Sequence, residues 1–111
     1  MILAMHRVLK RFSVDGLVTV VTGASSGIGQ HMASILAEAG ASLVIVARRQ
    51  QALDELASDI VSRNPEAKVA SISSDLDAVT DFDALAIKLS APFGSPTRLI
   101  NAAGKPRLLS P

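Results

Sequence analysis

A glycine-rich turn between an expected strand and an expected helix is the feature that most constrains this chain. Gly23, Gly27 and Gly29 follow the apolar residues 17–21 and precede residues 28–39, whose apolar side chains recur at helical spacing. Backbone N–H groups at a helix start point at incoming ligands, and the helix dipole favours negative charge there. Because glycine lets a ligand come close to the backbone, the turn predicts a pyrophosphate site.

Strands and helices are expected to alternate along the rest of the chain. Apolar runs predict strands at 17–22, 42–47, 68–73 and 98–102, and helical spacing predicts helices at 28–39, 53–61 and 81–90. Gly40 is placed to end the first helix, and Asn64-Pro65 ends the second. The apolar faces of the three helices are expected to comprise Ile28, Met32, Ile35, Leu36 and Ala39; Leu53, Leu56, Ile60 and Val61; and Phe82, Leu85, Ala86 and Leu89.

This alternation with short connections predicts an α/β fold, a Rossmann-type parallel sheet of strand order 3-2-1-4 with flanking helices. The composition agrees, because hydrophobic residues make up 49% of the chain and aromatic residues only 3%, as in buried parallel strands under alanine-rich helices. We expect a basic leader at residues 1–13 and a partial dinucleotide-binding domain at 14–111.

Charge and composition exclude several classes of function. Eleven basic residues against ten acidic ones give a net charge of +1, so nucleic acid is not an expected partner. The absence of cysteine excludes disulfides and thiolate chemistry, and His6 and His31 lack metal-ligand spacing. No apolar run approaches the roughly 18 residues of a membrane span. The acid-free leader is interpreted as a frayed start of a cytoplasmic protein, with an organelle-targeting peptide as the alternative.

Several motifs resemble those of the short-chain dehydrogenase/reductase family. The run Thr22-Gly23-Ala24-Ser25-Ser26-Gly27-Ile28-Gly29 resembles the family's cofactor loop, and Asp75-Leu76 follows the third strand where the family binds adenine. Leu99-Ile100-Asn101-Ala102-Ala103-Gly104 is similar to its fourth strand, with Ala102 in place of a second asparagine. The resemblance implies a dinucleotide site that includes Gly23, Ser25, Ser26, Gly27, Ile28, Gly29, Asp75, Leu76, Asn101, Ala102 and Gly104.

Each of these residues also has a purely structural interpretation. The glycines could serve only turn geometry and helix packing, and Ser25 and Ser26 could be helix caps as well as phosphate ligands. Asn101 is expected to join neighbouring strands by hydrogen bonds rather than to touch substrate. Asp75 could accept a hydrogen bond from the adenine amino group or cap the turn that follows it.

The second strand ends in Arg48-Arg49, about twenty residues after the glycine turn, and no acid occurs before Asp54. A carboxylate at this position would bind a ribose 2′-hydroxyl, whereas a guanidinium accepts a 2′-phosphate. Arg48, with Arg49 as a second candidate, therefore predicts NADP(H) over NAD(H). The alternative is that the two arginines form a solvated pair.

The family's catalysis uses a serine, a tyrosine and a lysine located after the fourth strand, and this sequence contains no tyrosine. We therefore assign no catalytic residue. The chain is expected to be the NADP(H)-binding part of an oxidoreductase that acts on a small carbonyl or alcohol, inactive by itself. The alternative is a stand-alone binding or interaction module. Leu99 and Ile100 are expected on an open sheet edge that could pair with another chain.

Overall fold

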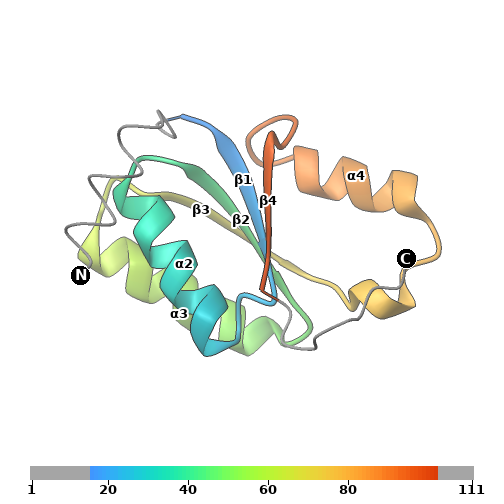
Figure 1. Ribbon diagram of the computed structural model, residues 1–111, viewed down its shortest axis with the longest axis horizontal. Coiled ribbons are helices and arrows are strands. Elements are labelled where there is room, and N and C mark those ends of the chain that lie inside the picture. Colours follow the sequence, from blue (N-terminus) through green and yellow to red (C-terminus); the bar gives the residue numbers. More distant parts are fainter. Residues whose placement is uncertain (1–15, 103–111) are drawn as a thin grey trace.

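The computed structural model describes residues 16–102, which form a parallel sheet with helices on both faces (Figure 1). The expected leader at 1–13 and the candidate residue Gly104 lie outside the described residues. The elements are β1 (Val18–Thr22), α2 (Gly27–Glu38), β2 (Ser42–Ala47), α3 (Gln50–Arg63), β3 (Lys68–Ser73), the short 3-10 helix η1 (Leu76–Ala78), α4 (Phe82–Ser90) and β4 (Arg98–Asn101).

The four strands are parallel and lie in the order β3-β2-β1-β4, as the alternation of elements predicted. Val20 of β1 is aligned with Val44 of β2 on one side and with Leu99 of β4 on the other. The direction of winding reverses between β1 and β4, and ligands of open α/β sheets bind at the carboxyl ends of the strands beside such a reversal. The glycine turn after β1 lies at this place.

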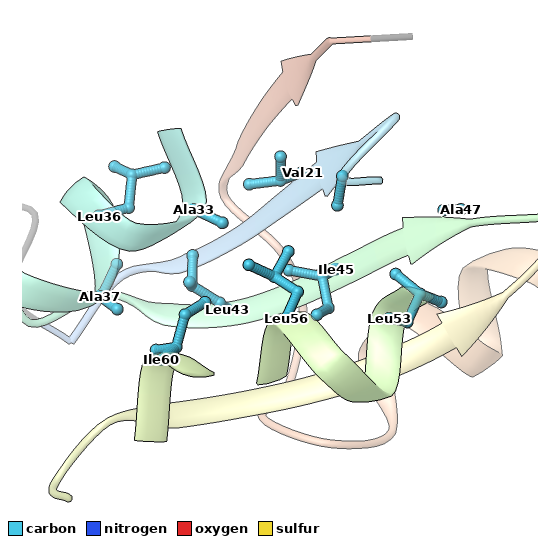
Figure 2. Close-up of a cluster of buried hydrophobic side chains, with 12 residues drawn as sticks. Val21, Ala33, Leu36, Ala37, Leu43, Ile45, Ala47, Leu53, Leu56 and Ile60 are labelled. Atoms are coloured by element: carbon cyan, nitrogen blue, oxygen red, sulfur yellow. The ribbon is translucent and has the colours of Figure 1, made fainter. Parts of the chain in front are cut away.

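Helices α2 and α3 cover one face of the sheet and form the main core (Figure 2). From the sheet, Val21, Leu43 and Ile45 are fully buried beneath the helices. Full burial of each such side chain contributes roughly 1.5–3 kcal/mol, so this layer provides much of the driving force for folding. The helices contribute Ala33, Leu36 and Ala37 from α2 and Leu53, Leu56 and Ile60 from α3.

Gly40 ends helix α2 as the sequence predicted. Its φ of 94° lies in the left-handed region that glycine tolerates. The N–H of Gly40 donates to the Ala37 carbonyl and the N–H of Ala41 donates to the Leu36 carbonyl, each at 3.1 Å. This pair of bonds is a Schellman motif, and it returns the chain directly into β2.

The opposite face of the sheet is covered more sparsely. Val20, Val44 and Val46 are buried there beneath Leu89 and Phe93, which belong to the end of α4 and the turn after it. Helix α4 lies on this side of the sheet, away from α2 and α3 (Figure 1), and has no buried residue. Strand β3 contributes to both faces, because Val69 packs on the α2/α3 face and Ile72 packs on this one.

Four expected members of apolar helix faces are in fact exposed. Ile28 is 74% exposed, Val61 42% and Phe82 68%, and Ala86 is exposed as well. The expected apolar faces were wrong at all four positions, because helical spacing does not show how far the neighbouring layer extends. Ile28 lies in the first turn of α2, beside the glycine turn and beyond the cover of the core.

Strand β4 forms one edge of the sheet within residues 16–102. Leu99 is 66% exposed on it, as expected for an open edge. Ile100 instead packs half-buried against the α2/α3 core, so only part of the predicted apolar edge faces solvent. None of the helices in this part of the chain is long and apolar enough to cross a membrane.

Candidate functional site

Hydrogen bonds join the ends of all four strands into one continuous edge. Beyond β1, the N–H of Ala24 donates to the Val46 carbonyl of β2 at 3.2 Å. On the other side, the N–H of Ala102 donates to the Thr22 carbonyl at 2.9 Å. The ladder also continues one step past β3, where the N–H of Ser74 donates to the carbonyl that ends β2 at 2.9 Å. The candidate residues that follow these strands are therefore neighbours in space.

Two of the three glycines are required by the protein's own geometry. Gly23 has a φ of 68°, which turns the chain out of β1 in a conformation that side chains disfavour. At Gly29 a Cβ would overlap the Gly23 carbonyl oxygen and would lie 2.9 Å from the Cα of Ala24. The absence of a side chain at Gly29 thus lets the first turn of α2 pack directly on the glycine turn.

Gly27 is different, because no atom of residues 16–102 lies within 4 Å of a Cβ built on it. Neither its conformation nor its packing inside the protein requires glycine. The N–H groups of Gly27 and Ile28 are the first two in the helix and find no protein acceptor among the hydrogen bonds of residues 16–102. Two such N–H groups, on exposed residues at the start of a helix, form a suitable cradle for an anion.

Ser26 is the N-cap of α2, and Ser25 is not. The Ser26 hydroxyl accepts from the N–H of Gly29 at 3.1 Å and donates to the Gly23 carbonyl at 2.9 Å. The same hydroxyl lies 3.2 Å from the carbonyl oxygen of Ala102, so it also connects the turn to the end of β4. Ser25 is exposed, and its carbonyl accepts from the Gln30 side chain at 3.2 Å.

Asn101 joins β4 to β1, as its structural interpretation predicted. The buried Thr22 hydroxyl donates to Asn101 Oδ1 at 2.9 Å and lies 3.4 Å from the Ile100 carbonyl oxygen. Asn101 itself is exposed at the edge where the strands end. The neighbouring Ala102 contributes main-chain groups only, through its N–H to Thr22 and its carbonyl to Ser26.

Arg48 and Arg49 follow β2 directly and are both exposed. Arg49 occupies the N-cap position of α3 without a side-chain cap bond. Within residues 16–102, neither guanidinium forms an ion pair, and the ion pair found there joins Arg63 to Asp59 at 3.4 Å. Two positive charges are thus held at the carboxyl edge of the sheet, one strand away from the glycine turn.

Asp75 and Leu76 follow β3 on the same edge. Asp75 Oδ1 accepts from the N–H of Asp77 at 3.1 Å and caps the short helix η1. This bond is the turn-capping role that the sequence allowed for Asp75. The Asp75 carboxylate is exposed, and Leu76 is 38% exposed beside it.

One contact at this edge was not predicted. The Ser73 hydroxyl donates to the Arg48 carbonyl at 2.8 Å, from the last residue of β3 to the first residue beyond β2. Ser73 belongs to none of the sequence motifs, and its place beside Arg48 follows only from the pairing register Ala47↔Ser73. A register derived from the two predicted strands would have located it.

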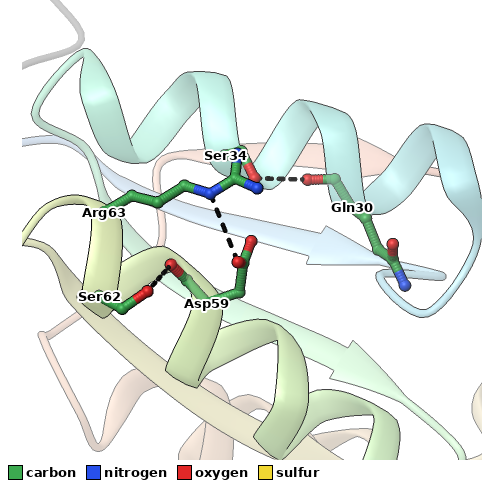
Figure 3. Close-up of polar contacts among 5 residues, drawn as sticks. All are labelled: Gln30, Ser34, Asp59, Ser62 and Arg63. Atoms are coloured by element: carbon green, nitrogen blue, oxygen red, sulfur yellow. Dashed lines mark hydrogen bonds and ion pairs between the residues drawn. The ribbon is translucent and has the colours of Figure 1, made fainter.

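A second polar region lies away from this edge, between α2 and α3. His31 is exposed there and borders a cavity of about 70 Å³ together with Ser34, Glu38 and Arg63. Figure 3 shows the local bonds of this region, including the Ser34 hydroxyl to the Gln30 carbonyl at 3.0 Å. Its residues belong to the outer helix layer, and no cluster of metal-ligating side chains occurs in the described part of the chain.

Comparison with known proteins identifies the family of this chain. The family model for short chain dehydrogenases matches residues 17–109. An uncharacterized oxidoreductase of Staphylococcus epidermidis is 40% identical over 88 residues, which are 79% of this chain and 36% of that protein. A fatty acyl-CoA reductase of Acinetobacter baylyi is 37% identical over 97 residues, which are 87% of this chain and 32% of that protein.

Solved structures resemble the fold over the same region. The L-sorbose reductase of Gluconobacter frateurii, in complex with NADPH and L-sorbose, superimposes with a TM-score of 0.74 at 34% identity. The match covers 83% of this chain and 35% of the reductase. The chain therefore spans about a third of the length of the relatives that it matches.

Proposed function

The chain belongs to the short-chain dehydrogenase family, and we propose that it is the NADP(H)-binding portion of an oxidoreductase acting on a carbonyl compound or a secondary alcohol. The observation that carries this proposal is the placement, at one end of the sheet, of an anion cradle and two arginines that form no ion pair within residues 16–102. NADPH would supply the hydride, and the residues at this edge bind and orient the cofactor. No residue of the chain is assigned a catalytic role.

The glycine turn binds the pyrophosphate in this proposal. The N–H groups of Gly27 and Ile28 donate to phosphate oxygens, and the positive end of the α2 dipole stabilises their charge. The exposed Ser25 hydroxyl is a third donor. Ser26 acts indirectly, because its hydroxyl is already engaged in holding the turn against Gly29 and Ala102. Gly23 and Gly29 provide the shape of the turn.

The end of β2 selects the cofactor. The planar guanidinium of Arg48 donates two parallel hydrogen bonds to a 2′-phosphate, and Arg49 adds a second positive charge. A charge-assisted hydrogen bond contributes on the order of 1.5–3 kcal/mol, which is roughly a ten- to a hundredfold difference in affinity. The first carboxylates after these arginines, Asp54 and Glu55, are held along α3 by the Gln50 and Gln51 side chains at 2.7 and 3.4 Å.

The remaining candidates surround the adenine and the far side of the turn. Asp75 accepts from the adenine amino group through the carboxylate oxygen that does not cap η1, while Leu76 packs against the ring edge. Asn101 and Ala102 border the cofactor beside the glycine turn, with Gly104 following them in sequence. A stand-alone binding module is less favoured, because the relatives named above are an oxidoreductase and two reductases.

Charge reversal at Arg48 tests this proposal. In the full-length protein, Arg48→Asp should change the preference from NADPH to NADH. The new carboxylate repels the 2′-phosphate of NADPH and accepts a hydrogen bond from the 2′-hydroxyl of NADH. NADPH and NADH dissociation constants are measured by isothermal titration for both proteins. Arg98→Asp is the matched control, because it makes the same charge change at the start of β4, where the amino ends of the strands lie, away from Arg48. An unchanged NADPH-to-NADH affinity ratio in Arg48→Asp would contradict the proposal.

A further inference from the structure

The end of β3 is fastened to the turn that carries the two arginines. The Ser73 hydroxyl donates to the Arg48 carbonyl oxygen at 2.8 Å, across a sequence separation of 25 residues. The regular pairing of β2 with β3 stops at Ala47 and Ser73, and one further main-chain bond follows from Ser74. The main chain of Arg48 thus leaves the sheet at the point where the Ser73 hydroxyl holds its carbonyl.

This bond fixes the peptide plane between Arg48 and Arg49. A fixed carbonyl direction restricts the ψ angle of Arg48. It thereby limits the directions in which the side chains of Arg48 and Arg49 leave the main chain. The N-cap residue of α3, Arg49, has no side-chain cap bond that would hold the turn from the helix side. The Ser73 hydroxyl is therefore well placed to order the turn before a ligand arrives, which reduces the entropy cost of binding.

We propose that Ser73 is a positioning residue for cofactor selection, which orients the Arg48–Arg49 turn toward a 2′-phosphate without touching the ligand. This inference rests on the proposed NADP(H) function of the same site. Its specific consequence is that loss of the hydroxyl weakens binding of NADPH while binding of NADH is preserved. If Ser73 only stabilised the sheet, its loss would instead weaken the binding of both cofactors equally or leave both affinities unchanged.

The sheet does not need the Ser73 side chain to form. Ser73 is exposed, and its pairing with Ala47 uses main-chain groups that remain in Ser73→Ala. The variant is therefore expected to fold like the parent, which a thermal unfolding curve checks. Ser73→Thr is the rescue variant, because it restores a hydroxyl on a β-branched side chain that suits a strand.

The experiment is a titration of the full-length parent, Ser73→Ala and Ser73→Thr with NADPH and with NADH. We expect Ser73→Ala to raise the NADPH dissociation constant roughly three- to tenfold, the range of one hydrogen bond, with NADH changed less than about twofold. Ser73→Thr should restore most of the NADPH affinity. Equal losses for both cofactors, or no loss for either, would overturn the positioning role.

Ser62→Ala is the matched control. Its hydroxyl donates to the Asp59 carbonyl at 2.9 Å, a bond of the same type at the other end of α3 (Figure 3). This variant should leave both dissociation constants unchanged. A parent protein that prefers NADH would overturn the proposed function and this inference together. A parent that prefers NADPH, with no selective loss in Ser73→Ala, would overturn only the role of Ser73.

Discussion

The Thr22 hydroxyl donates a hydrogen bond to Asn101 Oδ1 at 2.9 Å and joins the carboxyl ends of β1 and β4. The two residues are 79 positions apart in sequence and directly opposite each other in the strand register. The bond joins β1 to β4 at the place where the winding of the sheet reverses, beside the glycine turn. It therefore ties β4 to the strand from which the glycine turn emerges.

Thr22→Val removes this bond while keeping the shape of the buried side chain. We expect the free energy of unfolding to fall by about 0.5–1.5 kcal/mol, the net contribution of one hydrogen bond, as measured by urea denaturation. Thr97→Val is the control, because Thr97 is exposed and its hydroxyl contacts the Val18 carbonyl at 3.4 Å, at the other end of the same strand pair. Equal effects of the two substitutions would contradict a specific role for Thr22.

Alanine at Gly29 should destabilise the fold, whereas alanine at Gly27 should not. The added methyl group at Gly29 overlaps the main chain of Gly23, and overpacking of this kind costs typically 1–3 kcal/mol. At Gly27 the methyl group meets open space, so the free energy of unfolding should change by less than about 0.5 kcal/mol.

Gly27→Ala should nevertheless weaken NADPH binding, because the added methyl group would lie on the residue whose N–H is proposed to bind the pyrophosphate. Thermal unfolding and NADPH titration of both variants separate the two effects. Normal NADPH affinity in a stable Gly27→Ala protein would contradict the proposed pyrophosphate position.

Ser26→Ala removes the N-cap of α2. The loss should lower the free energy of unfolding by about 1 kcal/mol, within the range of 0.5–2 kcal/mol found for such caps. Ser25→Ala is the neighbouring control for stability, because the exposed Ser25 is linked to Gln30 through its carbonyl, which the substitution keeps. A larger loss in Ser25→Ala than in Ser26→Ala, in urea denaturation, would reverse the assignment of the cap.

The affinity for NADPH should depend on salt more steeply than the affinity for NADH. The proposed contact between the exposed arginines and a 2′-phosphate is screened as ionic strength rises, whereas the rest of the two cofactors is identical. Titrations between about 0.02 and 0.3 M salt, a range over which the screening length falls several-fold, measure the two slopes. Parallel slopes would show that no additional charge pair forms with NADPH.

Much of this fold is predictable from the sequence because its signals are local. The valine-rich strands, Gly40 and the glycine turn each carry the reason for their conformation in adjacent residues. The strand order then follows from the short connections and their handedness. The motif residues 23–29 and 101–102 consequently meet at the carboxyl ends of the strands.

The wrong predictions concern which helix and turn residues pack on the sheet. Phe82 and Ala86 have helical spacing, yet they are exposed because α4 contacts the sheet mainly through Leu89. Phe93 lies in a turn without periodicity, and it packs on Val20, Val44 and Val46 on the face opposite α2 and α3. The contact from Ser73 to Arg48 depends on the register of β2 and β3, which no single segment encodes.

The most direct test of the account is the ratio of NADPH and NADH dissociation constants for the unmodified full-length protein, measured by isothermal titration. The account predicts saturable binding of both cofactors, with NADPH tighter by roughly ten- to a hundredfold, the range of a charge-assisted contact to the 2′-phosphate. Equal affinities, a preference for NADH or an absence of saturable heat with NADPH would contradict it.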